Sequence, residues 1–311
     1  MAQKIIIDTD PGQDDAVALL LALASPDDLE VLGITSVAGN VPISYTTRNC
    51  LMLVELAHRT DVPVYQGSAG PLERELVTAE SIHGPTGIDG IDQPESSTHL
   101  ADGTAVEFII DTLMSTEDVI VCTLGPLTNI AHALTEEPRI APRIKQLVLM
   151  GGGHFEGGNI TPAAEFNIFV DPQAAAQVFA GGIPLVMMPL DVTHRAISTP
   201  SRIEAFRRLD TRAGDAVEGM LDFYHRYDIE RYGLPGGPLH DPTVIAYLID
   251  PSLFAGRHVN VEIETESALT LGATVVDWWG ATARPANCTV MREIDADGFY
   301  HLLVDRIGRL P

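Results

Sequence analysis

Short, nearly continuous apolar runs recur through the first two thirds of this 311-residue chain. Strands that are covered on both faces have this pattern, because neither face meets water. Between these runs, apolar residues recur at helical spacing, and such alternation is typical of repeated βαβ units around a parallel sheet. We predict strands at 4–8, 29–37, 62–65, 119–124, 146–150 and 184–192, and helices at 14–24, 43–59, 104–115, 127–134 and 172–179.

Three later or intervening segments depart from this alternation. Residues 72–100 are polar and rich in Gly and Pro, which predicts a long loop near a site or a lid over it. Residues 201–232 have a helical pattern, and 258–264 with 269–276 predict an antiparallel hairpin region. We find no internal repeat and no low-complexity linker, so we expect one large α/β domain over residues 1–311, with a mainly parallel, Rossmann-like sheet flanked by helices.

The charge of the chain argues against two kinds of partner. Nineteen Lys and Arg against 43 Asp and Glu give a formal net charge of −24, which opposes binding to nucleic-acid phosphates or anionic membranes. An acidic surface is ordinarily just a solvated one. Acidic residues gathered at one place, however, can hold a cation, so their position matters more than their total.

Three cysteines are widely separated and odd in number, which favours reduced thiols over a disulfide framework. The absence of a C-x-x-C pair argues against a thiolate zinc site. The first residues lack the apolar core and cleavage site of a signal peptide, and no apolar stretch reaches the roughly 20 residues of a membrane span. We therefore expect a cytoplasmic protein.

The strongest local signal is a cluster of acids directly after the first predicted strand. Four carboxylates lie within eight residues, in the run Asp8-Thr9-Asp10-Pro11-Gly12-Gln13-Asp14-Asp15. A Pro-Gly turn would fold Asp10 back toward Asp14 and Asp15, and converging acids repel each other unless a cation compensates. Oxygen ligands of this kind suit calcium or magnesium.

A plainer interpretation covers part of this cluster. Asp14 and Asp15 can cap the following helix and favour its positive end, although that explains only two of the four acids. An EF-hand loop counted from Asp8 would need an acid where Leu19 stands, so that motif is excluded.

The run DTDPGQDDAVALLLAL resembles the N-terminal signature of the inosine-uridine preferring nucleoside hydrolase family, and the resemblance extends over essentially the whole chain. The other motifs expected of that family follow in order. They are Val37-Ala38-Gly39-Asn40, Leu124-Gly125-Pro126-Leu127-Thr128-Asn129, Met150-Gly151-Gly152 before Asn159, Glu165-Phe166-Asn167 before Asp171-Pro172, and His240-Asp241-Pro242. The joint match is far more specific than any single motif.

The resemblance implies hydrolysis of the N-glycosidic bond of ribonucleosides by a water activated at Ca²⁺. The implied protein ligands are Asp10, Asp15, Asp241 and the backbone carbonyl of Leu124, where many relatives have Thr. A backbone ligand does not depend on its side chain, so that departure changes little. Asp10 would also be the general base, since a divalent cation lowers the pKa of its water.

The resemblance also assigns the substrate contacts. The ribose-binding positions are Asp14, Asn40, Asn159, Glu165 and Asn167, whose oxygens suit an electron-poor sugar ring in the transition state. Taken singly, each Asn is more often a turn residue. His240 matches a histidine that acts near the leaving base in one branch of the family, and His83 matches a base-pocket histidine of that branch. Tyr232 is a weaker base-pocket candidate, with Tyr224 and Tyr227 behind it.

Two rival functions remain open from the sequence. Asp8-x-Asp10 after a strand also resembles the nucleophile motif of haloacid dehalogenase-like phosphatases, but Pro11 and Gly12 replace the residues usual there. A ribose- or nucleoside-binding protein that keeps the metal without turnover is the other.

The histidines favour pyrimidine nucleosides or a broad inosine and uridine range, and the family resemblance implies a homodimer or homotetramer.

Overall fold

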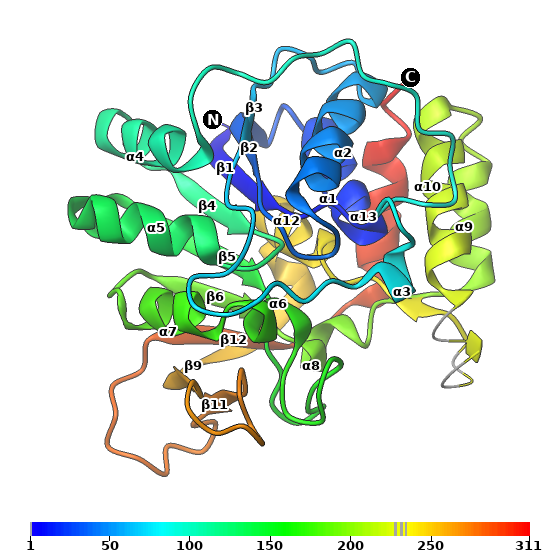
Figure 1. Cartoon of the computed structure of the whole chain (residues 1–311). Helices are drawn as coiled ribbons and strands as arrows, with labels where there is room; N and C mark the ends of the chain where they lie inside the picture. Colours follow the sequence, from blue (N-terminus) through cyan, green and yellow to red (C-terminus); the bar gives the residue numbers. More distant parts are fainter. Residues whose placement is uncertain (1, 227–228, 231–232, 234) are drawn as a thin grey trace.

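A computed structural model describes residues 2–226, 229–230, 233 and 235–311. Its centre is a sheet of eight strands in the order β3-β2-β1-β4-β5-β6-β12-β9 (Figure 1). Neighbouring strands are parallel except β9, which lies antiparallel to β12 at one edge. The strands are β1 (Gln3–Thr9), β2 (Leu29–Ser36), β3 (Val64–Gln66), β4 (Ile120–Thr123), β5 (Gln146–Met150), β6 (Leu185–Met188), β9 (Phe254–Val259) and β12 (Cys288–Ile294).

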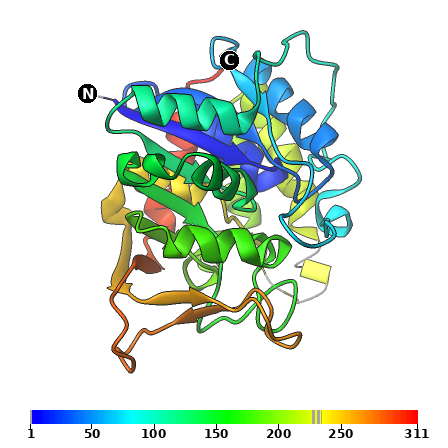
Figure 2. The same cartoon turned by 60° about the vertical axis from the view of Figure 1, so that its left-hand side comes forward.

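Helices cover both faces of this sheet, as the apolar runs of the strands require (Figures 1 and 2). Along β1, Ile5 and Ile7 belong to one core cluster and Ile6 to another, since successive side chains point to opposite faces. The first core includes α1 (Gln13–Leu23), α2 (Ile43–Leu56), α10 (Arg212–Tyr224), α12 (Pro242–Ile249) and α13 (Ala296–Ile307), and the second includes α4 (Ala105–Ser115), α5 (Thr128–Glu136) and α7 (Pro172–Ala180). The result is a single α/β domain.

Helix α1 has no exposed side, because every residue from Gln13 to Leu23 is buried. It packs between the sheet and the helices α2, α10 and α12. Its N-terminal acids therefore cannot be a solvated helix start, and they need partners inside the protein.

The remaining elements are short and lie in connections. They are α3 (Glu80–His83), α6 (Phe166–Val170), α8 (Leu190–Thr193), α9 (Pro200–Arg207), β7 (Ile197–Ser198), β8 (Gly237–Pro238), β10 (Val261–Ile263), β11 (Thr274–Val276) and the 3₁₀ turns Pro138–Arg143 and Pro251–Leu253. Of these, β7 pairs with β8 and β10 with β11, both antiparallel.

The predicted α/β fold with a mainly parallel sheet is confirmed, and two local predictions are wrong in part. The strand expected at 184–192 ends at Met188, because Pro189 has no N–H for the ladder and α8 follows. The expected hairpin at 258–264 is divided, since His258 and Val259 belong to β9 in the main sheet while β10 pairs with β11. Strand β12 was not predicted.

The loop at 72–100 is long and irregular, as predicted, and α3 is the helix found within its described residues. It passes in front of the sheet in Figure 1 and brings α3 to the N-terminal end of α1, where Gln13 donates a hydrogen bond to the carbonyl of His83. None of the helices in the described part of the chain is long and apolar enough to span a bilayer.

Candidate active site

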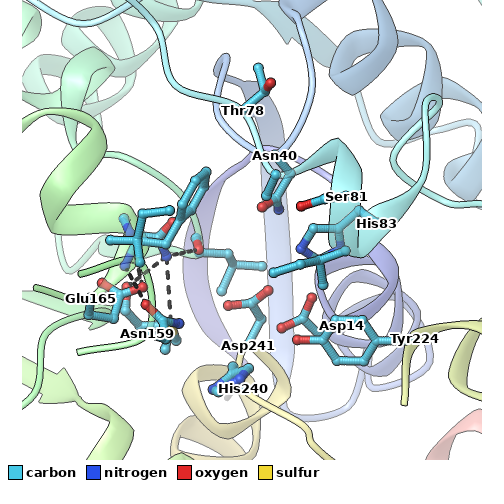
Figure 3. A pocket seen from close by; sticks show the side chains of 17 residues that line it. Asp14, Asn40, Thr78, Ser81, His83, Asn159, Glu165, Tyr224, His240 and Asp241 are labelled. Carbon is cyan, nitrogen blue, oxygen red and sulfur yellow. Dashed lines mark hydrogen bonds between the residues drawn. The ribbon is translucent and has the colours of Figure 1, made fainter. Parts of the chain in front are cut away.

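A pocket opens where the strands β1, β2, β4 and β5 end, which is where ligands bind in open parallel sheets. Its walls come from segments far apart in the sequence (Figure 3). Ten of the predicted site residues line it: Asp14, Asn40, His83, Leu124, Asn159, Glu165, Asn167, Tyr224, His240 and Asp241. Asp10 and Asp15 are fully buried, outside the lining.

The turn after β1 is built around the carboxylate of Asp10. Its Oδ2 accepts a hydrogen bond of 2.7 Å from the backbone N–H of Asn40, which follows β2. A Cβ added at Gly39 would lie 2.0 Å from Oδ2, and one at Gly125 would lie 2.2 Å from Oδ1. Both motif glycines are therefore needed so that the two neighbouring strand ends can approach this carboxylate.

Asp15 is fixed from three sides. Its Oδ1 accepts a hydrogen bond of 2.5 Å from Thr9, and its Oδ2 accepts bonds from the Gly12 backbone N–H at 3.0 Å and the Asn40 side chain at 3.1 Å. The contact with Gly12 is the capping interaction that the plainer sequence interpretation expected for Asp15. It does not remove the negative charge.

Asp14 and Asp15, at the start of α1, meet Asp241 at the start of α12. Each offers a carboxylate oxygen, and these atoms all lie within 4.8 Å of one another. The group formed by this criterion contains Asp14 and not Asp10, whereas the predicted ligand set contained Asp10. Asp10 is nevertheless a close neighbour, because the negative charges of Asp15 and Asp14 both act on it.

The acids strongly disfavour one another's ionisation. Burial, and next the charge of Asp15, raise the pKa of Asp10 well above its usual value and that of Asp14 to about 7. Burial followed by the charge of Asp14 raises the pKa of Asp241 well above the usual range. The cluster holds charge that the surrounding protein does not neutralise.

The donor set fits a hard divalent cation. Asp10 Oδ1 is buried without a hydrogen-bond partner among the described residues, although the other oxygen of the same carboxylate is bonded. Unpaired carboxylate oxygen and mutual repulsion are what a bound cation removes, and carboxylates with backbone carbonyls are the ligands of calcium and magnesium. These acidic residues can bind a metal ion.

On the opposite wall, Glu165 and Asn167 are held rigidly. The carboxylate of Glu165 caps α6 and accepts hydrogen bonds from the backbone N–H groups of Asn167 and Gly152, both at 2.9 Å. The Asn167 amide donates to the carbonyl of Leu124 at 2.7 Å, and Asn159 accepts from the Phe166 N–H at 2.9 Å. The Leu124 carbonyl, the predicted backbone ligand, is therefore oriented by a hydrogen bond from Asn167.

Glu165→Gln is expected to change the pH dependence of stability. Burial raises the pKa of Glu165 to about 7, above the roughly 4.3 of an unfolded glutamate. Because the folded state holds the proton of Glu165 more tightly than the unfolded state does, the protonated carboxyl group adds to the free energy of unfolding. This addition is complete below pH 4 and is lost as the pH rises through 7. Glutamine stays neutral, so in chelator the variant should gain roughly 3 kcal/mol relative to wild type between pH 4 and 8. Urea denaturation at both pH values measures this, and parallel stability profiles would contradict it.

Two histidines, His83 and His240, line the same pocket as Asp14 and Asp241. His240 Nδ1 lies 2.7 Å from the hydroxyl of Thr193 in α8, and burial, followed by the charge of His194, lowers the pKa of His240 to about 3. His83 comes from α3 and stacks on Tyr224, with ring centroids 5.3 Å apart. Figure 3 shows His83 and Tyr224 on the same side of the pocket as Asp14, with His240 below Asp241. Tyr232 and Tyr227, the other predicted candidates, lie outside the described residues.

A model of the family described as inosine-uridine preferring nucleoside hydrolase matches residues 5–301. The chain belongs to this family. Ribonucleoside hydrolases are N-glycosyl hydrolases, so this chain is an enzyme of that class, and the phosphatase interpretation is set aside.

Relatives and solved structures agree with the family. An uncharacterized protein of Schizosaccharomyces pombe is 53% identical over 310 residues, which is 99% of this chain and 100% of the relative. The pyrimidine-specific ribonucleoside hydrolase RihA of Salmonella paratyphi B is 47% identical, with 99% of each chain covered. The solved purine-preferring ribonucleoside hydrolase of Gardnerella vaginalis is 34% identical, with a TM-score of 0.92 and 98% of each chain covered.

Sequence reasoning missed several residues of the nucleoside hydrolase pocket. Thr78 and Ser81 line it from the irregular loop, and Ile160 lines it from the connection before α6. Nothing in their local pattern distinguished them from ordinary loop residues. Asn129, part of a quoted motif, lies behind the site instead, where its amide donates to Asp8 at 2.7 Å and to the carbonyl of Ser36 at 3.0 Å.

Proposed function

We propose that the chain hydrolyses the N-glycosidic bond of ribonucleosides with a calcium-activated water, and that its preferred substrates are pyrimidine nucleosides or a broad inosine and uridine range. One observation carries the proposal. The acids at the start of α1 and Asp241, more than 200 positions further along the chain, converge beside a pocket lined by amides, a buried glutamate and two histidines.

The pocket has the electrostatics that this reaction needs. Breaking the bond builds positive charge on the ribose, and the buried oxygens of Asp14, Glu165 and the pocket amides stabilise it. We assign ribose binding to Asp14, Asn40, Asn159, Glu165 and Asn167. Deoxyribonucleosides, which lack a hydroxyl for these groups, should be poor substrates.

Asp10 is our candidate for the general base. Its Asn40 contact fixes one oxygen and leaves Oδ1 available to take a proton from the attacking water. Asp10, Asp15, Asp241 and the Leu124 carbonyl would hold the ion. When bound, calcium would supply Lewis-acid activation and orientation of that water.

At the other end of the bond, the departing base needs a proton. We assign this role to His240, whose ring is oriented by Thr193 and lies next to Asp241 in the sequence. Because burial lowers the pKa of His240 to about 3, its ring is neutral in the free protein, so it would have to gain a proton as negative charge builds on the departing base. The base preference rests on His83 and His240 together and is supported by the 47% identity to enzymes named as pyrimidine-specific. A purine-preferring structure at 34% identity has the same fold, so the fold does not decide the base.

A panel of purine and pyrimidine ribonucleosides tests the proposal, with free base and reducing sugar both measured. Release of both products from uridine or cytidine, alone or with inosine, is the expected result. Cleavage of adenosine at comparable or higher rates would overturn the base preference. Tight binding of nucleosides without release of base over hours would overturn the reaction.

His240→Ala is expected to slow nucleosides with poor leaving groups the most, by about 10²-fold or more, because general acid catalysis contributes on that scale. Rates with p-nitrophenyl riboside, whose leaving group needs no proton, should change little. His194→Ala is the matched control, since its ring lies 5.8 Å from that of His240 but does not line the pocket. Equal losses on all substrates would remove the acid role.

Three further proposals concern the whole protein: its domain organisation, its location and its oligomeric state. We infer that residues 1–311 fold as one unit, which a single cooperative unfolding transition would support. Cys50, Cys122 and Cys288 are buried and free, as a reducing cytoplasm allows, and cell fractionation tests that location. A homodimer or homotetramer is expected, and light scattering measures it.

A further inference from the structure

Gln13, at the first position of α1, is a buried polar residue that the proposed reaction does not use. Its side chain is 0% exposed. The amide nitrogen donates to two backbone carbonyls of the 72–100 loop, His83 at 2.9 Å and Asp89 at 3.1 Å. A third contact joins Gln13 Oε1 to His83 Nδ1 at 2.7 Å.

The two carbonyls determine which way round the amide lies. A carbonyl can only accept, so the amide group facing both must be the NH₂, and the group facing His83 must be the oxygen. That oxygen also can only accept. The hydrogen bond of 2.7 Å therefore requires a proton on Nδ1 of His83.

This assignment fixes the other ring nitrogen. Burial lowers the pKa of His83 to about 3, so the ring is neutral near pH 7 and carries one proton. With that proton on Nδ1, Nε2 has a lone pair and no hydrogen.

Among the described residues, none forms a hydrogen bond with this unprotonated nitrogen. Nε2 is also not one of the unpaired side-chain atoms that are fully shielded from solvent, so it remains accessible. His83 is 6% exposed and lines the pocket, where Tyr224 stacks on it with an interplanar angle of 21°. The ring plane is thus held by stacking, and the Nε2 edge keeps access to the pocket that His83 lines.

We propose that Gln13 is a positioning residue for base recognition, because it locks the Nδ1–H tautomer of His83 and so presents Nε2 as an acceptor for an N–H group of the nucleobase. The inference rests on the proposed function. The proposal defines a class of bases, those that present an N–H group on the edge facing α3: the ring N–H beside a carbonyl in uracil and hypoxanthine, or the exocyclic amine of cytosine. Bases without such a donor leave a desolvated acceptor unpaired and bind more weakly.

The tautomer itself can be observed without any substrate. Long-range ¹H–¹⁵N spectra distinguish a protonated from an unprotonated ring nitrogen, and a His83→Asn sample identifies the resonances of His83. We expect an unprotonated Nε2 and a protonated Nδ1 across pH 6 to 8 in wild type. A protonated Nε2 would overturn the proposal directly.

Substrate analogues test what the bare nitrogen does. Methylation of uridine at N3 removes the ring N–H, whereas 5-methyluridine carries a methyl group and keeps it. We expect kcat/KM for 3-methyluridine to fall by about 10- to 100-fold relative to 5-methyluridine, mainly through KM, as expected for loss of one hydrogen bond to a buried acceptor. Equal values for the two would overturn the proposed contact.

Gln13→Met links the two measurements. Without the acceptor oxygen, the ring is free to place its proton on Nε2, so the spectrum should shift and the discrimination against 3-methyluridine should fall at least about threefold. Asn49→Leu is the matched control, because the Asn49 amide also tethers this loop, to Thr86 at 2.8 Å, without touching His83. A purely structural Gln13 would give both variants similar losses and an unchanged ratio.

The possible failures are distinguishable. If wild type releases no base from any nucleoside, the proposed function fails while the tautomer measurement still stands. If wild type cleaves uridine but Gln13→Met changes neither the ring protonation nor the analogue ratio, the further inference alone fails.

Discussion

Asp10→Ala should lower kcat for uridine by about 10³-fold or more while the protein stays folded. Loss of a general base costs about 10²- to 10⁴-fold, and loss of a predicted metal ligand at the same position adds to it. The fold should survive, because the substitution removes one charge from a group of acids that repel one another. Steady-state kinetics and circular dichroism on the same preparation measure both parts.

Asp8→Asn is the matched control for this variant. Asp8 lies on the same strand end, and burial raises its pKa to about 7, so it is also a buried acid. Its Oδ1, however, accepts hydrogen bonds from Thr35 and Asn129 and lies outside the acidic group beside the pocket. We expect Asp8→Asn to retain turnover within about tenfold, since an amide oxygen keeps those bonds. Similar losses in both variants would show a general effect of buried charge.

Much of the sheet was predictable because its signal is local. Strands β1, β2, β4 and β5 are apolar on both faces, and helices between them must bury one side. The edge of the sheet was harder. Strand β9 has four exposed residues in six, so its pattern is not that of a strand covered on both faces. Among the described residues it pairs with β12, across β10 and β11, and this antiparallel edge departs from the parallel βαβ pattern.

The acidic half of the site was predictable for a different reason. A strand that ends in four carboxylates conflicts with the cost of burying charge, and that conflict by itself indicates a cation. Which acids meet was not predictable, because Asp14 and Asp10 differ only in how the Pro-Gly turn directs them. The structure groups Asp14 with Asp15 and Asp241.

The half of the site facing the base was the least predictable. Thr78, Ser81 and His83 lie on a loop without periodic pattern, and their positions depend on buried tethers such as Gln13 and Asn49. In the sequence, Gln13 was only the residue between Gly12 and Asp14. Its role follows from the carbonyls of His83 and Asp89, which lie 70 and 76 positions away in the sequence. The residues next to Gln13 in the sequence could not predict that these carbonyls lie beside it.

Exhaustive chelation is expected to abolish turnover, and calcium should restore it. Without a cation, the acids of the cluster take up protons or repel each other, and Asp10 loses the environment in which it can act as a base. Because the ion binds the folded state, adding calcium at 100 times its Kd should stabilise the protein by about 2.7 kcal/mol. Calorimetry of chelated and reloaded samples should therefore show a Tm rise of several degrees.

Asp241→Asn makes this prediction specific to the cluster. It removes one of the three converging carboxylates, so both the calcium-dependent Tm rise and turnover should be lost together. Magnesium offers a second discrimination, since it demands a tight octahedral arrangement and gives up water reluctantly, whereas calcium tolerates irregular carboxylate and carbonyl ligands. We expect calcium to restore more activity than magnesium at equal concentration. Full activity after chelation, or a Tm rise that Asp241→Asn retains, would mean that the acids meet for a purpose other than holding the catalytic ion.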